Sequence, residues 1–171
     1  MTLATMKASL AVEETNAAVL AANPKWIGLM DFVQSFSDGT TAGKFDLVYM
    51  SERTVATGAN DDIDLAGVLT SPLGDTITAA EIVAVFLINR QKNGTVNTTD
   101  LTIGAGTNPW IGVLGATHTI GPIKPGGMVM IGAGDAAGIG VVTAGTGDIL
   151  RVANSAGAAN TYQIGILARS A

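Results

Sequence analysis

Three aspartates in the stretch Asp61-Asp-Ile-Asp64 are the side chains whose spacing best fits metal chemistry. Carboxylates at alternate positions supply the oxygen ligands that calcium prefers. The stretch lacks the central Gly and closing Glu of a calcium-binding loop, and alternate carboxylates also form the ordinary solvated face of a strand. We therefore predict neither a metal nor any other cofactor, while binding of a cation by Asp61, Asp62 and Asp64 stays open.

His118 is the only histidine of the chain, so any Ser/His/Asp catalytic set would have to include it. Serines and aspartates are available as partners, but the sequence has no Gly-x-Ser-x-Gly nucleophile elbow. The hydroxyl neighbours in Thr117-His-Thr119 indicate a residue in the middle of a strand, on a surface or at an interface.

The remaining acidic and glycine-rich stretches fit no catalytic or phosphate-binding signature. The glycine-rich stretches are Gly104-Ala-Gly106, Gly132-Ala-Gly134 and Gly145-Thr-Gly147. None is followed by the Lys that a phosphate-binding loop needs, so we predict turns between strands, in which Gly supplies positive φ. Glu13, Glu14, Glu52 and Glu81 lie in no recognisable pair for glycoside hydrolysis. We predict that the protein is not an enzyme and has no catalytic residue.

The composition favours a protein whose surface is covered by other subunits. Charged residues make up 13% of the 171 residues, about half the usual share of a soluble domain, and 22 residues are Gly. The mean hydropathy is +0.40. So few charges leave much of the surface apolar, which is typical of subunits that assemble. We predict a homo-oligomer, such as a homotrimer, over a small monomer with an Ala- and Gly-rich surface.

Charge and cysteine content exclude several kinds of partner. The formal net charge is −5, and no cluster of Lys or Arg is present to bind phosphates, so we predict no nucleic-acid partner. Cys is absent, which excludes disulfides and Cys-ligated zinc. The longest apolar run, residues 82–88, is far too short to span a bilayer, and the start of the sequence does not resemble a signal peptide. We expect no membrane partner and assembly in the cytoplasm.

Short apolar runs separated by turn residues predict an all-β fold for residues 45–171. In Thr161–Arg169 the apolar residues Tyr162, Ile164, Ile166 and Ala168 alternate with the others, the period of a strand with one buried face. Further strands are expected over residues 45–55, 61–67, 101–104, 118–120, 128–131, 139–143 and 148–152. Residues 78–90 contain the strongest apolar run and predict a central strand with both faces covered. We predict a β-sandwich or jelly roll of about 8–10 antiparallel strands.

Residues 1–44 form a separate N-terminal arm in this prediction. The stretch Lys7–Glu13 alternates like a strand, but its Ala, Leu and Glu content also suits a helix, and we favour an extended arm. The arm carries large apolar side chains that something must cover, and we predict an interface at six of them. These are Trp26, Ile27, Leu29, Met30, Phe32 and Phe36. Two alternatives stay open: they cap the end of their own sandwich, or they dock on a neighbouring subunit.

A set of motifs in residues 37–171 carries a family resemblance. The most specific are Asp64-Leu-Ala-Gly67 and Thr143-Ala-Gly-Thr-Gly-Asp148. The others are Thr76-Ile-Thr78, Thr107-Asn-Pro-Trp110, Lys124-Pro-Gly-Gly127 and Thr161-Tyr-Gln-Ile164. Together they resemble a family of small structural proteins of tailed bacteriophages. The resemblance implies a component of the virion that is assembled in the host cytoplasm.

Among virion components, we expect first a capsid decoration or cement protein, because the chain combines a small β-domain with an arm. Its partners would then be copies of itself and the major capsid protein. A tail fibre, spike or host-glycan-binding protein is the second expectation, with Trp110 beside Pro109 as the aromatic platform for a sugar. No heptad or repeat of a fibre shaft is visible in the sequence. A tail-tube or connector subunit is the third.

Overall fold

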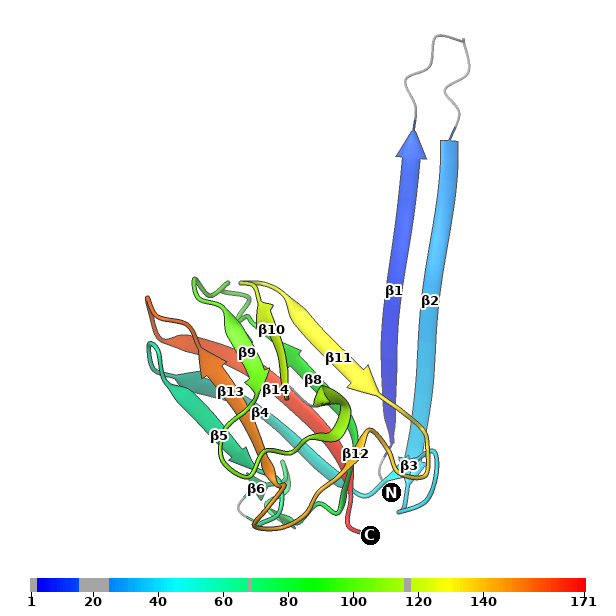
Figure 1. The fold of residues 1–171 in the computed structure, drawn as a ribbon. Coiled ribbons are helices and arrows are strands. Elements are labelled where there is room, and N and C mark those ends of the chain that lie inside the picture. The colour runs from blue at the N-terminus through cyan, green and yellow to red at the C-terminus, as the bar shows by residue number, and fades with distance from the viewer. Residues whose placement is uncertain (1–2, 16–24, 68, 116–117) are drawn as a thin grey trace, which may run out of the picture.

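The computed structural model describes residues 3–15, 25–67, 69–115 and 118–171. The chain is nearly all β, with a sandwich-like fold and a long hairpin projecting from one end (Figure 1), as the sequence predicted. In the described residues the one helical element is a short 3₁₀ turn, η1, at Gly112–Leu114.

Two antiparallel sheets make up the sandwich. The sheet next to the hairpin, here called the arm-side sheet, has the order β11 (Met128–Gly132), β8 (Glu81–Ile88), β14 (Asn160–Arg169) and β4 (Leu47–Val55), with β12 (Gly140–Val141) also pairing with β8. The second sheet has the order β10 (Thr119–Ile123), β9 (Leu101–Gly104), β13 (Ile149–Asn154) and β5 (Asn60–Asp64). The strands β6 (Leu69–Thr70) and β7 (Thr76–Ile77) pair in a separate small ribbon, whose Leu69 and Ile77 side chains belong to the main core. The nine strands of the two sheets agree with the predicted number.

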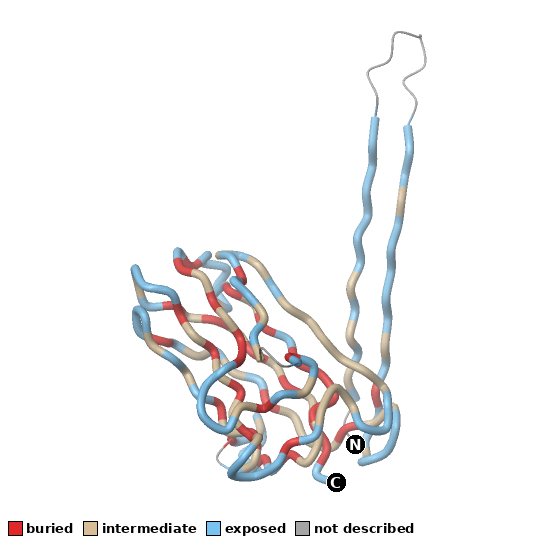
Figure 2. The backbone as a smooth tube through the Cα atoms, viewed as in Figure 1, coloured by how far each residue is buried: buried red, intermediate tan, exposed pale blue. Residues whose placement is uncertain are grey.

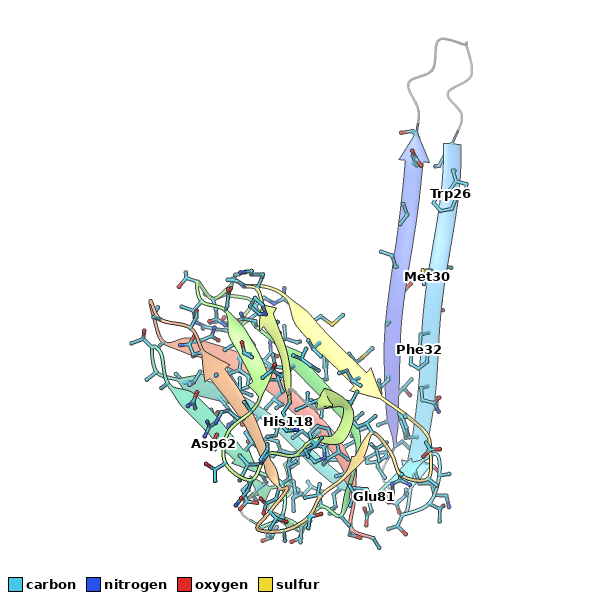
Figure 3. All side chains as sticks on the ribbon, viewed as in Figure 1. Trp26, Met30, Phe32, Asp62, Glu81 and His118 are labelled. Atoms are coloured by element: carbon cyan, nitrogen blue, oxygen red, sulfur yellow. The ribbon has the colours of Figure 1, made fainter. Side chains whose placement is uncertain are left out.

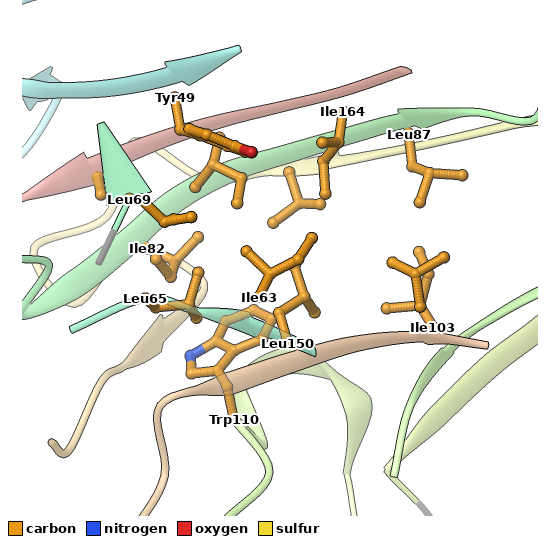
Figure 4. Close-up of a cluster of buried hydrophobic side chains, with 14 of the residues drawn as sticks. Tyr49, Ile63, Leu65, Leu69, Ile82, Leu87, Ile103, Trp110, Leu150 and Ile164 are labelled. Atoms are coloured by element: carbon orange, nitrogen blue, oxygen red, sulfur yellow. The ribbon is translucent and has the colours of Figure 1, made fainter. Parts of the chain in front are cut away.

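The core lies between the two sheets and follows the alternation of the sequence. Tyr162, Ile164, Ile166 and Ala168 of β14 are all buried, as predicted. Ile63 is also buried, and it faces the strands of the arm-side sheet from β5 (Figure 4). Burying alternate side chains of each strand leaves the sandwich with a single apolar interior.

The hairpin consists of β1 (Ala4–Thr15) and β2 (Lys25–Asp38), which pair antiparallel from Ala4 opposite Phe36 to Thr15 opposite Lys25. The extended conformation predicted for the arm is therefore found. The end of β2 pairs parallel with the short strand β3 (Lys44–Phe45). The predicted boundary at residue 44 thus falls at β3, a few residues beyond the end of the hairpin.

A second, smaller core cluster joins the hairpin to the sandwich. Phe36, Phe45 and Val83 are fully buried in it. Ala4 and Met6 of β1 pack against this cluster from the hairpin, and Val48 and Leu167 pack against it from the arm-side sheet. The base of the hairpin is therefore held by apolar packing, whereas the tube turns to the exposed colour farther out (Figure 2).

The structure corrects two local predictions. His118 does not lie in mid-strand: it precedes β10 with φ of 54°, a left-handed conformation that His adopts more readily than most residues. Its carbonyl oxygen accepts a hydrogen bond from the amide of Ala105 at 2.6 Å. The β8 strand is central, but its far face is only partly covered, since the Phe86 side chain is 37% exposed.

Candidate functional site

The even-numbered residues of the hairpin form one face, which is mostly apolar. Cross-strand pairing places β1 and β2 residues of even number opposite each other, and side chains two apart in a strand point to the same face. On β1 these are Ala4, Met6, Ala8, Leu10, Val12 and Glu14, and on β2 they are Trp26, Gly28, Met30, Phe32, Gln34 and Phe36. Apart from Glu14 and Gln34, this face is therefore apolar along the hairpin.

Only the base of this face is covered by the chain itself. Phe36 is 2% exposed at the base, whereas farther out Phe32 is 46%, Met30 73% and Trp26 59% exposed. Figure 3 shows Trp26, Met30 and Phe32 along β2, with Trp26 farthest from the base of the hairpin and Phe32 nearest to it. Trp26 packs its ring over Gly28, where a Cβ atom would come within 2.2 Å of the ring. The outer part of the hairpin thus presents a row of large apolar groups to solvent.

The opposite face of the hairpin is mixed in character. Ile27 and Leu29 are exposed there, together with Asp31. The Nζ atom of Lys25 forms an exposed ion pair with a carboxylate oxygen of Glu13 at 2.8 Å. Because it carries these charged groups, this face is better suited to contact with water than the even-numbered face is.

The structure distinguishes between the two open alternatives for the six predicted interface residues. Trp26, Ile27, Leu29, Met30 and Phe32 do not cap their own sandwich, because all five are exposed. Phe36 is the exception: it lies at the base of β2, inside the second core cluster, and is not available to a partner. Phe36 therefore follows the first alternative, because the register brings this residue onto Phe45 of β3.

The arm-side sheet carries a second apolar surface that the sequence analysis missed. Met130 lies opposite Phe86, Phe86 opposite Gly165, and Gly165 opposite Met50, so the four form one row across β11, β8, β14 and β4. Met50 is 69% exposed. The sequence shows apolar residues two positions apart at Met128 and Met130 and at Ala84 and Phe86. This pattern does not say which face of the sheet is covered by the rest of the chain.

Two hollows flank this row. One, of about 350 Å³, lies between the first residues of β1 and the sheet, and the other, of about 300 Å³, extends toward Glu52 and Lys92. Met50, Phe86 and Gly165 line both. Gly165 has no side chain, so the surface is recessed between its neighbours. A Cβ atom added there would have no contact closer than 3.9 Å.

The three aspartates are each engaged by groups of their own chain. The carboxylate of Asp61 accepts hydrogen bonds from the Arg53 guanidinium at 2.6 and 2.5 Å and from the Tyr162 hydroxyl at 2.7 Å. The carboxylate of Asp62 accepts two from Arg151 at 2.6 and 2.7 Å. Asp64 accepts one from the amide of Ala66 at 2.9 Å. They point to different partners, and the described residues contain no group of three or more potential metal ligands.

These contacts set the charges of the aspartates. Burial opposes ionisation of Asp61, but the hydrogen bonds from Arg53 and Tyr162 outweigh it and lower the pKa of its carboxyl. Burial, together with the Asp61 contact, raises the pKa of the Tyr162 hydroxyl. The hydrogen bonds from Arg151 lower the pKa of Asp62. Both aspartates are therefore anions in structural ion pairs.

The other residues considered for chemistry are scattered. Asp62, Glu81 and His118 lie on separate parts of the sandwich (Figure 3). Glu81 forms an ion pair at 3.1 Å with the buried guanidinium of Arg169. Within the described residues the imidazole of His118 makes no hydrogen bond to a hydroxyl or carboxylate. The side chains of Asp62, Glu81 and His118 thus do not meet in space.

Trp110 does not form a sugar-binding platform. It is 1% exposed, and its ring packs against Gly112 and Gly140, where added Cβ atoms would come within 2.2 and 3.0 Å of it. The indole lies in the main core with Ile63 and Leu150 (Figure 4). The prediction that Trp110 offers a face to a glycan is wrong.

Comparison with protein-family models, curated proteins and solved structures finds no match to this chain. Among the residues that the structure describes, no helix is long and apolar enough to cross a membrane. The candidate functional site is therefore defined by the geometry alone: the outer part of the hairpin and the open row on the arm-side sheet.

Proposed function

We propose that this protein is a structural subunit of a larger protein particle and that the β1–β2 hairpin docks it there. The observation that carries the proposal is the apolar face of the hairpin, covered at Phe36 and exposed at Phe32, Met30 and Trp26. A two-stranded hairpin is only marginally stable in water by itself. Contiguous exposed apolar groups of this size are typical of protein interaction sites.

The rest of the molecule supports a structural role over a catalytic one. The aspartates that looked most reactive are held in ion pairs with Arg53 and Arg151. The acidic net charge of −5 disfavours a nucleic-acid surface. A host-glycan-binding role depended on Trp110 as a platform for a sugar, and Trp110 is buried.

Within this class we propose a decoration or cement protein of a tailed-bacteriophage head, present in the virion and assembled in the host cytoplasm. The sequence motifs that resemble phage structural proteins support it, as does the combination of a small sandwich with a long docking arm. Its partners are other copies of this chain and the major capsid protein. The proposal includes no catalytic activity and no cofactor.

The direct test is to locate the protein in particles of the phage that encodes it, by electron microscopy with an antibody raised against the purified chain. We expect labelling over the head surface. Labelling confined to the tail would replace the head-decoration role by a fibre or tail role. Unlabelled virions, with the protein absent from them in a denaturing gel, would overturn the virion proposal.

A binding assay then tests the part played by the hairpin. Heads from a phage lacking the gene are mixed with purified protein and sedimented. We expect the wild type to sediment with the heads, and a Trp26→Ser, Phe32→Ser double variant to remain in solution. Leu73→Ser is the matched control, since Leu73 is 93% exposed on the turn between β6 and β7. Equal binding by all three proteins would show that attachment to the head does not need the hairpin.

A further inference from the structure

We infer that the hairpin of one copy docks on the arm-side sheet of a second copy, over the row formed by Met130, Phe86, Gly165 and Met50. The inference rests on the proposed role of the hairpin as a docking element and names both its partner and the surface that receives it. The partner is another copy of this chain because each copy already binds a hairpin on the adjoining part of this surface.

The base of the hairpin shows which surface suits its apolar face. Met6 lies directly over the sheet, with its Sδ atom 2.5 Å from where a Cβ atom of Gly132 would be and its side chain close to Ala84. Gly132 lies opposite Ala84, Ala84 opposite Leu167, and Leu167 opposite Val48. This row across the four strands is thus covered by its own hairpin.

The open row is the next one on the same face of the sheet. Met130, Phe86, Gly165 and Met50 each lie two residues along the strand from a member of the covered row, so their side chains point to the same side. The composition is of the same kind: the covered row has two large apolar residues, an alanine and a glycine, and the open row has three large apolar residues and a glycine. The covered contact and the open row are therefore continuous parts of one apolar surface.

The following row marks the edge of this surface. Met128 lies opposite Ile88, Ile88 opposite Gln163, and Gln163 opposite Glu52. The amide of Lys92 donates a hydrogen bond to Glu52 at 2.9 Å beside it. An apolar centre with a polar rim is the usual anatomy of a protein interface.

The hairpin does not cover the open row of its own copy. It extends away from the sandwich beyond its base (Figure 1), and Met50 and Phe86 remain exposed in the presence of their own hairpin. At the same time Trp26, Met30 and Phe32 are exposed in their own copy. Docking between copies covers both exposed surfaces with one contact. The recess at Gly165 leaves room for a large side chain of the hairpin.

Cross-linking between two variants tests the contact. The natural chain has no cysteine, so a Met30→Cys protein and a Met50→Cys protein carrying a mass tag can be mixed and treated with a short bis-maleimide. We expect the mixed product to dominate on a denaturing gel. Leu73→Cys in place of Met50→Cys is the control and should give at least ~10-fold less mixed product, as expected for a site outside a specific interface. A product formed only between two Met30→Cys chains would show pairing of hairpins and overturn the inference.

Two substitutions in the receiving surface provide an independent test by light scattering. Gly165→Val adds a strand-favouring side chain where there is open space, so the fold should persist. The added side chain fills the recess that receives the hairpin. Phe86→Lys places a charge in the row. We expect each to raise the dissociation constant of the oligomer at least ~10-fold, which corresponds to about 1.4 kcal/mol. Leu73→Lys should leave it unchanged, and circular dichroism would verify the fold of all three.

The outcomes separate this inference from the proposed function. If Trp26→Ser, Phe32→Ser dissociates the oligomer while Gly165→Val and Phe86→Lys do not, the hairpin docks elsewhere, and the inference fails although the docking role stands. If the wild type is a monomer at every concentration tested, the inference fails as well. Labelled virions would still support the proposed function in either case.

Discussion

The rings of Phe36 and Phe45 meet edge to face, with their centroids 6.5 Å apart and their planes at 89°. Phe36 is near the end of β2 and Phe45 is in β3, so this contact joins the hairpin to the first strand leading into the sandwich. Both rings are buried, and an aromatic pair of this geometry adds about 0.5–1.5 kcal/mol to the free energy gained by burial. The pair is the anchor from which the hairpin projects.

We predict that Phe36→Ala destabilises the protein by about 3–5 kcal/mol, because it removes a fully buried ring and leaves a cavity beside Phe45. The free energy of unfolding from urea titrations monitored by circular dichroism is the measurement. Leu73→Ala, at an exposed turn, should change it by less than about 0.5 kcal/mol. A loss below about 1 kcal/mol for Phe36→Ala would mean that the anchor contributes little.

The two aspartate ion pairs should differ in their contribution to stability. Asp61→Asn removes the charge that accepts hydrogen bonds from Arg53 and Tyr162 in a largely buried setting, and we expect a loss of about 2–3 kcal/mol. Asp62→Asn is the matched control, because its pair with Arg151 is more exposed and should contribute less than about 1 kcal/mol. Urea unfolding near neutral pH measures both, and equal losses would contradict the assignment.

The same pair predicts a dependence on pH. Burial disfavours the Asp61 carboxylate, yet its hydrogen bonds bring its pKa below the ordinary value of 3.8. A lowered folded-state pKa gives stability that is fully present above the unfolded-state pKa and is lost as the pH falls through the folded-state pKa. The difference in unfolding free energy between wild type and Asp61→Asn should therefore be full at about pH 7 and shrink below about pH 4. A difference that stays constant down to about pH 2 would disprove this linkage.

A buried amide network gives a further prediction. The Asn89 amide donates to the carbonyls of Thr99 and Ile123, and its oxygen accepts from Asn97 and Asn160, all at 2.9 Å. Asn89→Leu removes one hydrogen-bond partner from each of these four groups and buries an apolar side chain among them, and we expect a loss of at least about 3 kcal/mol. Thermal or urea unfolding tests this.

The exposed turn residue Asn93 provides the comparison for Asn89. Asn93→Ala removes a side-chain acceptor from the amide of Thr95, at 2.9 Å in the same segment of chain, and should cost about 1 kcal/mol or less. Similar effects of the two substitutions would show that the buried network is not what stabilises this end of the sandwich.

Features set by local alternation could be predicted from the sequence. Tyr162 and Ile164 mark the buried face of β14, and Ile63 marks that of β5, because a strand places every second side chain on the same side. The continuous apolar run of β8 predicted a central strand but not the exposure of Phe86. Which face a second element covers depends on the whole fold.

Features that depend on distant partners could not be predicted. Arg53 and Tyr162 are 8 and 101 residues from Asp61, so nothing near the aspartates identified the groups that neutralise them. Trp110 has no periodic apolar neighbours, and its burial comes from the approach of Gly140 to its ring. The register that buries Phe36 and exposes Phe32 follows from strand pairing, which the mixed helix and strand propensities of the arm left undetermined.

The hairpin also has edges. Beyond its base each strand has a neighbour on one side only, so the outward backbone amides and carbonyls of β1 and β2 are free to pair with another strand within the described residues. Unpaired strand edges with apolar side chains favour pairing between chains. We therefore expect concentrated protein to associate edge to edge through the hairpin and dilution to limit this.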